Sequence, residues 1–245
     1  MRLLLCALTG MGNHVLESLM AWPRLGELAV ITRREPGPFP HYCCGKLDAL
    51  CASRGIVCRT DLRLDSAEGQ AFVSGFAPSV LLCATFHQRI PAGILARRAL
   101  RALNVHPSLL PGYRGPTPTN WAILRGEAET GISFHQLSEG LDEGGLYAQR
   151  RLAVGERTDG ELRLALAELA ASEVCGVLDE VLEGRLAPVD QDVSRASWLP
   201  KVGSPEGLKI LLRERPPRER LQRGLTPLPG VDFLERVLRE LEEPA

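Results

Sequence analysis

Several features that would place this chain in a membrane or on nucleic acid are absent from its sequence. No run of eighteen apolar residues occurs, and Met1 to Leu8 leads into a glycine-containing turn without the small-residue cleavage site of a secretory signal. The formal net charge is −1, which argues against a broad basic surface. We therefore expect a cytoplasmic protein with a small-molecule partner and with neither a membrane nor a nucleic acid as partner.

The cysteines lack the spacing of a common metal site. His41 and four of the seven cysteines fall within residues 41–58, but their spacing fits neither paired Cys-x-x-Cys nor a familiar zinc pattern. Cys51 stands between Leu47, Leu50 and Ile56, where a buried apolar residue is expected. A metal site in this window is the alternative; we favour reduced structural thiols and no metal.

A dinucleotide-binding fingerprint is incomplete as well. Gly10 and Gly12 follow an apolar run, but Val15 occupies the third glycine position. The second strand pattern ends in Thr32-Arg33-Arg34, where an acid would be needed to bind the ribose. A nicotinamide cofactor is therefore disfavoured, and the glycines are interpreted as a tight turn from strand to helix.

What the sequence does contain is an alternation of strand and helix patterns. Strands are predicted over 2–8, 28–31, 56–58 and 80–84, and helices over 15–19, 45–54 and 67–75. Such alternation predicts an α/β fold, a mostly parallel sheet with helices on both faces, and ligands beyond the carboxyl ends of the strands.

The second half predicts a hairpin and a long helix. Residues 132–137 alternate and pair with 146–152, and a capping box at Thr158 and Glu161 opens a helix that Gly184 ends. A short amphipathic helix is predicted over 231–241. We expect a catalytic domain over residues 1–189, and a linker with a small C-terminal appendage over 190–245.

The chemistry is concentrated in two short segments. Asn104 and His106 stand two apart at the end of a strand pattern, so their side chains point the same way, and Asp142 follows in a glycine-flanked loop. An amide, an imidazole and a carboxylate suit attack of a neutral amine on a carbonyl carbon, because the oxyanion needs donors and the nitrogen must lose a proton. The alternative is that these are turn residues.

The whole stretch NVHPSLLPGYRG (residues 104–115), with the loop EGLDEGG (139–145), resembles the formyltransferases that use 10-formyltetrahydrofolate. Similarity extends upstream through residues 86–91 and downstream to about residue 149. The resemblance implies a Rossmann-like formyltransferase fold and makes Asn104, His106 and Asp142 the catalytic residues. It also implies that the folate is held by two segments, namely Phe86, Arg89 and Ile90, and the loop residues Leu137, Ser138, Glu139, Gly140 and Leu141. His87 is a further candidate to approach the folate, whereas His135 is interpreted as a packed or surface histidine.

The resemblance leaves the amine acceptor open. Methionyl-tRNA formyltransferases carry a further β-barrel domain, and the segment after Pro200 is shorter than such a barrel needs, so a nucleotide-linked amino sugar is preferred. A basic segment could meet its diphosphate; it includes Lys209, Arg213, Arg215, Arg218, Arg220 and Arg223. A solvated helical face is the simpler interpretation of that segment.

Other functions remain as alternatives. They are an amino-acid or peptide N-formyltransferase of a natural-product pathway, a methionyl-tRNA or glycinamide ribonucleotide formyltransferase, a 10-formyltetrahydrofolate hydrolase, and a noncatalytic folate-binding protein. A homodimer is expected by analogy with sugar-acting relatives.

Overall fold

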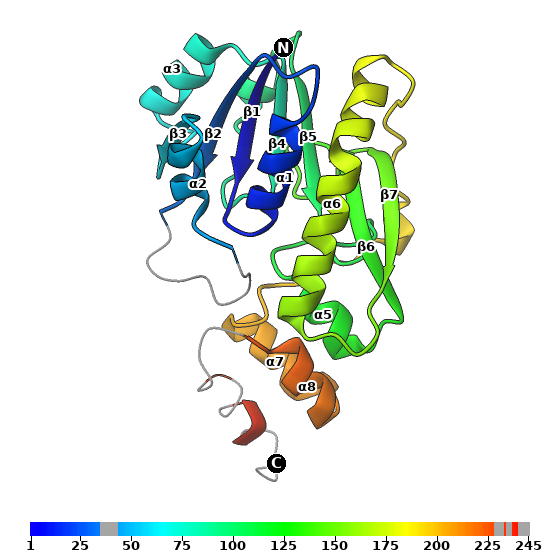
Figure 1. Ribbon diagram of the computed structural model, residues 1–245. Coiled ribbons are helices and arrows are strands. Elements are labelled where there is room, and N and C mark those ends of the chain that lie inside the picture. The colour runs from blue at the N-terminus through cyan, green and yellow to red at the C-terminus, as the bar shows by residue number, and fades with distance from the viewer. Residues whose placement is uncertain (35–43, 228–232, 234–236, 240–245) are drawn as a thin grey trace.

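A seven-stranded sheet forms the centre of the computed structural model, which describes residues 1–34, 44–227, 233 and 237–239 (Figure 1). The strands are β1 (Arg2–Ala7), β2 (Glu27–Thr32), β3 (Val57–Thr60), β4 (Val80–Ala84), β5 (Arg101–His106), β6 (Glu129–Gln136) and β7 (Leu146–Ala153). The helices are α1 (Met11–Met20), α2 (Leu47–Ser53), α3 (Ala67–Phe76), α4 (Ala92–Leu95), α5 (Pro118–Arg125), α6 (Asp159–Leu182), α7 (Pro205–Glu214) and α8 (Arg218–Gly224), with a short 3-10 helix at Val193–Arg195.

The strand order is β3-β2-β1-β4-β5-β6-β7. The first five strands are parallel, and β6 and β7 join the edge as an antiparallel hairpin. Parallel strands end at the same edge of a sheet, so the loops after β4 and β5 open toward the same side. The predicted α/β fold is confirmed.

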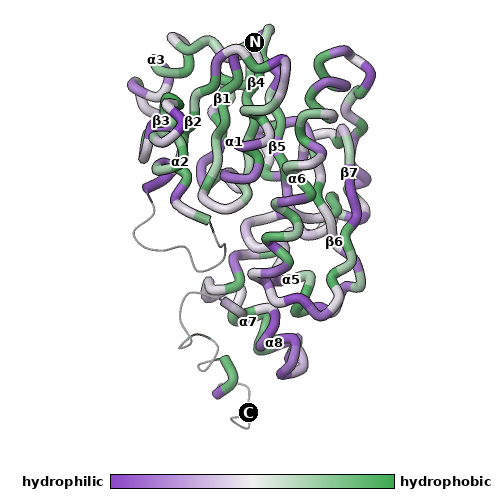
Figure 2. The backbone as a smooth tube through the Cα atoms, viewed as in Figure 1, coloured by the Kyte–Doolittle hydropathy of each residue, from purple (hydrophilic) through white to green (hydrophobic). Residues whose placement is uncertain are grey.

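Alternating side chains of the central strands bury both faces of the sheet. Leu3 and Leu5 of β1 pack under α1 and α6, whereas Leu4 and Cys6 pack on the opposite face with residues of α3 and α4. Figure 2 shows β1 and β4 as mostly hydrophobic and α8 as mostly hydrophilic. Helices therefore cover both faces, as predicted.

Local signals in the sequence match the boundaries of these elements closely. The Thr158 side chain accepts from the Glu161 N–H, the Glu161 side chain accepts from the Thr158 N–H, and α6 begins there. Gly184, with a φ of 71°, follows the end of α6. Of the helix predicted over 231–241, only residues 233 and 237–239 are described, and these are helical.

The segment after α6 packs against α5, which follows the motif turn, the loop of residues 107–115 after β5. Trp121 and Leu124 of α5 share a buried cluster with residues of the later segment, namely Leu199, Val202, Leu211, Leu221, Leu225 and Val237. The Asn120 side chain also donates to the Gly224 carbonyl at 2.7 Å. The domain boundary at residue 189 stays a prediction, and contacts across it are extensive.

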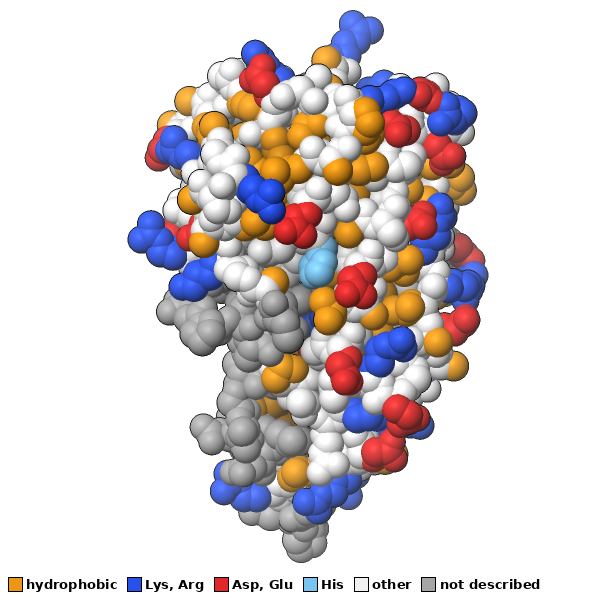
Figure 3. Space-filling model, viewed as in Figure 1, with side chains coloured by type: hydrophobic (Ala, Val, Ile, Leu, Met, Phe, Trp, Pro, Cys, Tyr) orange, Lys and Arg blue, Asp and Glu red, His pale blue; other side chains and the backbone are white. Residues whose placement is uncertain are grey.

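The surface mixes both signs of charge. On the face drawn in Figure 3, acidic and basic side chains are interspersed. Of the basic segment, Arg220 and Arg223 are partly buried, and Lys209, Arg213 and Arg215 are exposed. Among the described residues, no helix combines the length and the apolar character that a membrane crossing requires.

Candidate active site

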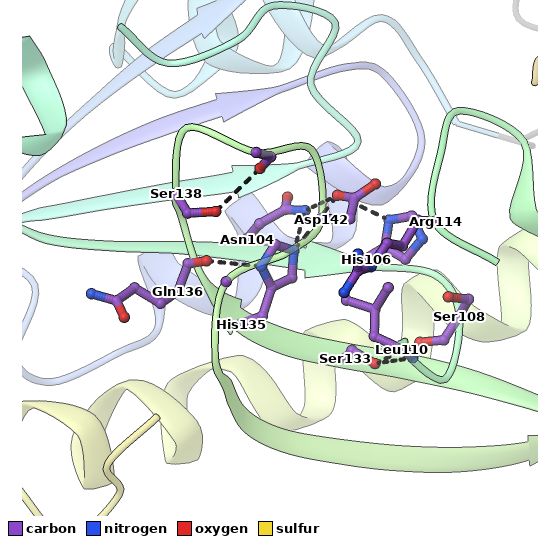
Figure 4. A network of polar contacts seen from close by, with 12 residues as sticks. Asn104, His106, Ser108, Leu110, Arg114, Ser133, His135, Gln136, Ser138 and Asp142 are labelled. Atoms are coloured by element: carbon purple, nitrogen blue, oxygen red, sulfur yellow. Dashed lines mark hydrogen bonds and ion pairs between the residues drawn. The ribbon is translucent and has the colours of Figure 1, made fainter. Parts of the chain in front are cut away.

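Asn104, His106 and Asp142 come together at the end of β5 (Figure 4). His106 Nδ1 lies 3.5 Å from Asp142 Oδ1, and Asn104 Nδ2 lies 3.4 Å from the same oxygen. Asp142 has a φ of 56°, a left-handed conformation that Asp tolerates and that a turn demands. The loop after β6 thereby carries the carboxylate back over the end of β5.

The hydrogen bonds of His106 fix its tautomer. Its Nε2 lies 3.0 Å from the Tyr113 carbonyl, which can only accept, so Nε2 carries a hydrogen. In the neutral ring Nδ1 is then the basic nitrogen, and it faces Asp142. This arrangement suits a base: a proton taken up at Nδ1 lies directly beside a carboxylate.

Burial and charge act in opposite directions on this pair. Burial lowers the pKa of His106 below its ordinary value of 6.5, although Asp142 opposes that shift. Burial by itself raises the pKa of Asp142, but His106, His135 and the Gly115 N–H outweigh it and lower this pKa to about 2. At neutral pH the site therefore holds an ionised Asp142 and a neutral His106 that is ready to take a proton.

His135 is the site residue that sequence analysis missed. Its side chain is 2% exposed, and its Nδ1 donates to the Gln136 carbonyl at 2.9 Å, which leaves Nε2 as an acceptor. Asn104 Nδ2 donates to that Nε2 at 2.9 Å. His135 is packed, as expected, but it is packed against the candidate catalytic residue Asn104 and sets which way the Asn104 amide points.

A signal for His135 was present in the strand pairing. Asn104 pairs with His135 and His106 pairs with Ser133 across β5 and β6. Both β6 residues are buried polar side chains on either side of the buried Phe134, and buried polar side chains need partners. The Ser133 hydroxyl donates to the Ser108 carbonyl at 2.6 Å and accepts from the Leu110 N–H at 3.0 Å, which fastens the motif turn to β6.

A second buried network, centred on Gln191, holds the loop that carries Asp142. Gln191 Nε2 donates to the carbonyls of Asp142 and Gly144, both at 2.8 Å, and Gln191 Oε1 accepts from Arg114 Nη2 at 2.7 Å. The Gly115 N–H donates to Asp142 Oδ2 at 3.0 Å. A residue of the segment after α6 thus helps to position the Asp142 carboxylate.

The two segments expected to hold the folate lie beside this network. Phe86 and Leu137 pack against the apolar cluster that contains Ile90, and the Leu137 N–H donates to the Ala102 carbonyl of β5 at 2.9 Å. Leu141 is 40% exposed, and Arg89 is exposed as well.

Backbone groups of the loop are available to a ligand. The backbone N–H groups of residues 138–141 form no hydrogen bond with any part of the chain that the structure describes. Half-exposed apolar side chains next to open backbone donors fit a flat heterocycle with a polar edge. His87, the other candidate, is exposed and packs edge-on against Phe86, with 4.8 Å between ring centroids.

Comparison with known proteins agrees with this geometry. A family model described as formyl transferase matches residues 53–175. The chain is 35% identical over 235 residues to the methionyl-tRNA formyltransferase of Desulfovibrio desulfuricans, covering 94% of this chain and 70% of that protein.

Two solved structures share the fold. One is a Mycobacterium tuberculosis protein proposed to be a sugar N-formyltransferase, with a TM-score of 0.66 and 22% identity over 95% of this chain and 89% of that one. The other is an N-formyltransferase from Helicobacter canadensis, in complex with folinic acid and dTDP-3-aminofucose. Its TM-score is 0.62, with 16% identity over 81% of this chain and 70% of that one.

Proposed function

The chain belongs to the formyl transferase family, and from this premise we propose that it transfers the formyl group of 10-formyltetrahydrofolate to the amine of a nucleotide-linked amino sugar. Family membership confirms the predicted class of enzyme. It also confirms 10-formyltetrahydrofolate as the donor at the level of the family. The residue roles and the acceptor are our proposals.

The observation that carries formyl transfer is the orientation of His106. The attacking amine forms a bond to the formyl carbon and loses a proton, and His106 Nδ1 is placed to take that proton beside Asp142. Returning it to the departing nitrogen of tetrahydrofolate completes the transfer, so that no proton is left over. Neutral His106 at neutral pH supports this role.

Asn104 is proposed to stabilise the oxyanion. One of its N–H groups donates to His135 Nε2 at 2.9 Å. The other donates to Asp142 Oδ1 at the longer distance of 3.4 Å. A bond that long is weak, so this second N–H can be redirected to a developing negative charge without a large loss. We therefore assign the donated hydrogen bond to that N–H.

The nucleotide sugar is preferred for two reasons. The likeness to the Mycobacterium tuberculosis protein runs over 95% of this chain, so this fold serves a proposed sugar N-formyltransferase along nearly its whole length. In addition, Lys209, Arg213 and Arg215 are exposed and could contact a diphosphate.

Methionyl-tRNA is the second candidate acceptor. It is favoured by the 35% identity to a methionyl-tRNA formyltransferase, which exceeds the identity to either solved sugar enzyme. The exposed basic side chains of α7 would suit RNA phosphates equally well. The predictions of no nucleic-acid partner, of a homodimer and of a cytoplasmic location all stay predictions.

The decisive experiment offers several amines to the same enzyme. The protein is incubated with 10-formyltetrahydrofolate and dTDP- or UDP-linked amino sugars, methionyl-tRNA, free amino acids or no acceptor, and products are screened by mass spectrometry for the gain of one formyl group. We expect formylation of a nucleotide sugar. Formylation of methionyl-tRNA alone would replace it with the second candidate, tetrahydrofolate release without acceptor would indicate a hydrolase, and no release at all would indicate a binding protein.

The basic segment is tested by charge removal. Lys209→Ala or Arg213→Ala should raise the KM for the phosphate-bearing acceptor and leave the KM for the folate nearly unchanged, because the contact is the same in ground and transition states. Higher salt should mimic the substitution by screening. Glu206→Ala, an exposed change on the same helix, serves as the control.

A further inference from the structure

One of the three tryptophans of the chain is exposed beside the active site. Trp22 and Trp121 are 3% and 0% exposed, and each indole N–H donates a hydrogen bond within the protein. Trp198 is 59% exposed, and its indole N–H has no hydrogen-bond partner in the described parts of the chain. A ligand that covers a ring of this size removes apolar surface from water. Binding there is therefore favoured by the hydrophobic effect.

The backbone around Trp198 is fixed to the catalytic motif. The Arg114 N–H donates to the Ser197 carbonyl at 2.9 Å, and the Leu199 N–H donates to the Arg114 carbonyl at 3.0 Å. The Ser197 hydroxyl accepts from the Tyr113 N–H at 2.8 Å, and Leu199 is buried. Both neighbours of Trp198 are therefore anchored, so its indole is presented in a prepared position, which lowers the entropic cost of binding.

Gly115 connects the indole with the catalytic carboxylate. Indole Nε1 lies 3.5 Å from the point where a Cβ would stand at residue 115, and the Gly115 N–H holds Asp142 Oδ2 at 3.0 Å. Residue 115 has a φ of 114°, and a Cβ there would stand 2.3 Å from the Leu199 carbonyl oxygen, so only glycine fits. Residue 115 thus places no side chain between the indole and Asp142.

We propose that Trp198 is the platform on which the sugar ring of the acceptor stacks, with the acceptor amine directed toward His106 and Asp142. This inference rests on the proposed function. An amino sugar has a face of C–H groups that packs on an aromatic ring and hydroxyl groups that accept from an N–H. Trp198 offers both, an open ring face and an unused N–H, next to the residues that must meet the amine.

The test separates acceptor binding from donor binding. With dTDP-3-aminofucose as the probe acceptor, Trp198→Ala should raise the acceptor KM about ten-fold and change the KM for 10-formyltetrahydrofolate less than two-fold, because stacking on an aromatic ring is lost only for the acceptor. Trp198→Phe should recover most of the affinity, since it keeps a ring face. Val193→Ala is the matched control: Val193 is 77% exposed on the same segment and makes only backbone hydrogen bonds.

A binding measurement gives a second readout that does not need turnover. Because Trp22 and Trp121 are buried, saturation with dTDP-3-aminofucose should quench the fluorescence of the wild-type protein and leave that of Trp198→Phe nearly unchanged. Suppose that the wild-type enzyme formylates the nucleotide sugar but that Trp198→Ala has the same acceptor KM. The role of Trp198 would then be wrong, and the proposed function would still hold. If the wild-type enzyme formylates methionyl-tRNA alone, the proposed acceptor is wrong. The proposal that a sugar ring stacks on Trp198 is then wrong as well.

Discussion

Two pairs of neighbouring strands in the same sheet bury very different side chains. In β1 and β4 every side chain that is buried is apolar, from Leu3 to Ala7 and from Val80 to Ala84. Where β5 and β6 pair, apolar residues alternate with polar ones; four of these polar residues are Asn104, which is partly buried, and the buried His106, Ser133 and His135. Within one sheet, the buried side chains thus change from apolar to partly polar between the paired strands β4 and β5.

Under the proposed mechanism, β1 and β4 are the scaffold, and β5 and β6 carry the chemistry. A buried polar group without a partner costs about 1–3 kcal/mol of folding free energy. A sequence optimised for stability alone would therefore avoid placing four polar side chains in two paired strands. Here each has a partner, and the hydrogen bonds converge on Asp142 and the motif turn. The apolar strands hold the position of β5, and β5 and β6 hold the groups that we propose to react.

The sharpest way to test this comparison is to remove a reacting group. His106→Ala and Asp142→Ala should each lower kcat by about two to four orders of magnitude, because proton transfer or its electrostatic support is lost, while both variants stay folded. Steady-state kinetics and thermal denaturation measure the two effects. His14→Ala, on α1 and outside the site, is the control and should keep full activity; near-wild-type turnover of either site variant would contradict the assignment.

The complementary change removes a scaffold side chain. Leu81→Ala on β4 deletes a side chain that is 0% exposed and should lower the free energy of unfolding by about 2–5 kcal/mol. The rate per folded molecule should stay within about two-fold of the wild type, since Leu81 contacts no reacting group. Denaturant titration combined with activity at low temperature tests this. A loss of rate as large as that of His106→Ala would mean that scaffold and chemistry are not separate.

A smaller effect is expected where a polar residue supports another. His135→Leu should lower kcat about ten- to a hundred-fold, because the Asn104 amide loses the acceptor that orients it. His135→Gln should recover most of that loss, since its amide oxygen can accept the same hydrogen bond. If both variants were equally impaired, His135 would act through its volume or its ring rather than through this hydrogen bond.

The smallest predicted effect is a displacement of the pH profile. His106 must be neutral to take a proton, and burial lowers its pKa, so kcat should fall as pH drops through a midpoint below 6.5. Asp142 raises that pKa, so in Asp142→Asn the residual activity should show its acid limb at a still lower pH. Profiles of kcat against pH for both proteins check this. A midpoint that rises in the variant would contradict the pairing of the two side chains.

The local patterns of the sequence were sufficient for most of the elements and for selecting three candidate residues that the fold brings together. The apolar runs at 2–8 and 80–84 became β1 and β4, and the capping box at Thr158 began α6. Asn104 and His106 were placed on the same side of one strand from their spacing of two residues. Local sequence is enough for that inference. Asp142 was joined to them because a carboxylate completes the chemistry, and the resemblance supported that choice. The roles of all three residues, like those of the folate segments, are still predictions.

The tertiary structure alone decided how these residues are supported. His135 is 31 residues from Asn104 and Gln191 is 49 residues from Asp142, so their contacts depend on strand register and on where the segment after α6 returns. The tautomer of His106 depends on the Tyr113 carbonyl, which is only 7 residues away but reaches Nε2 because the chain turns back after β5. Trp198 reads as an ordinary apolar residue in the sequence, and only the folded chain shows it exposed beside Gly115. Periodicity reports which way a side chain points along its own element, whereas hydrogen-bond partners and exposure depend on elements far away in the chain.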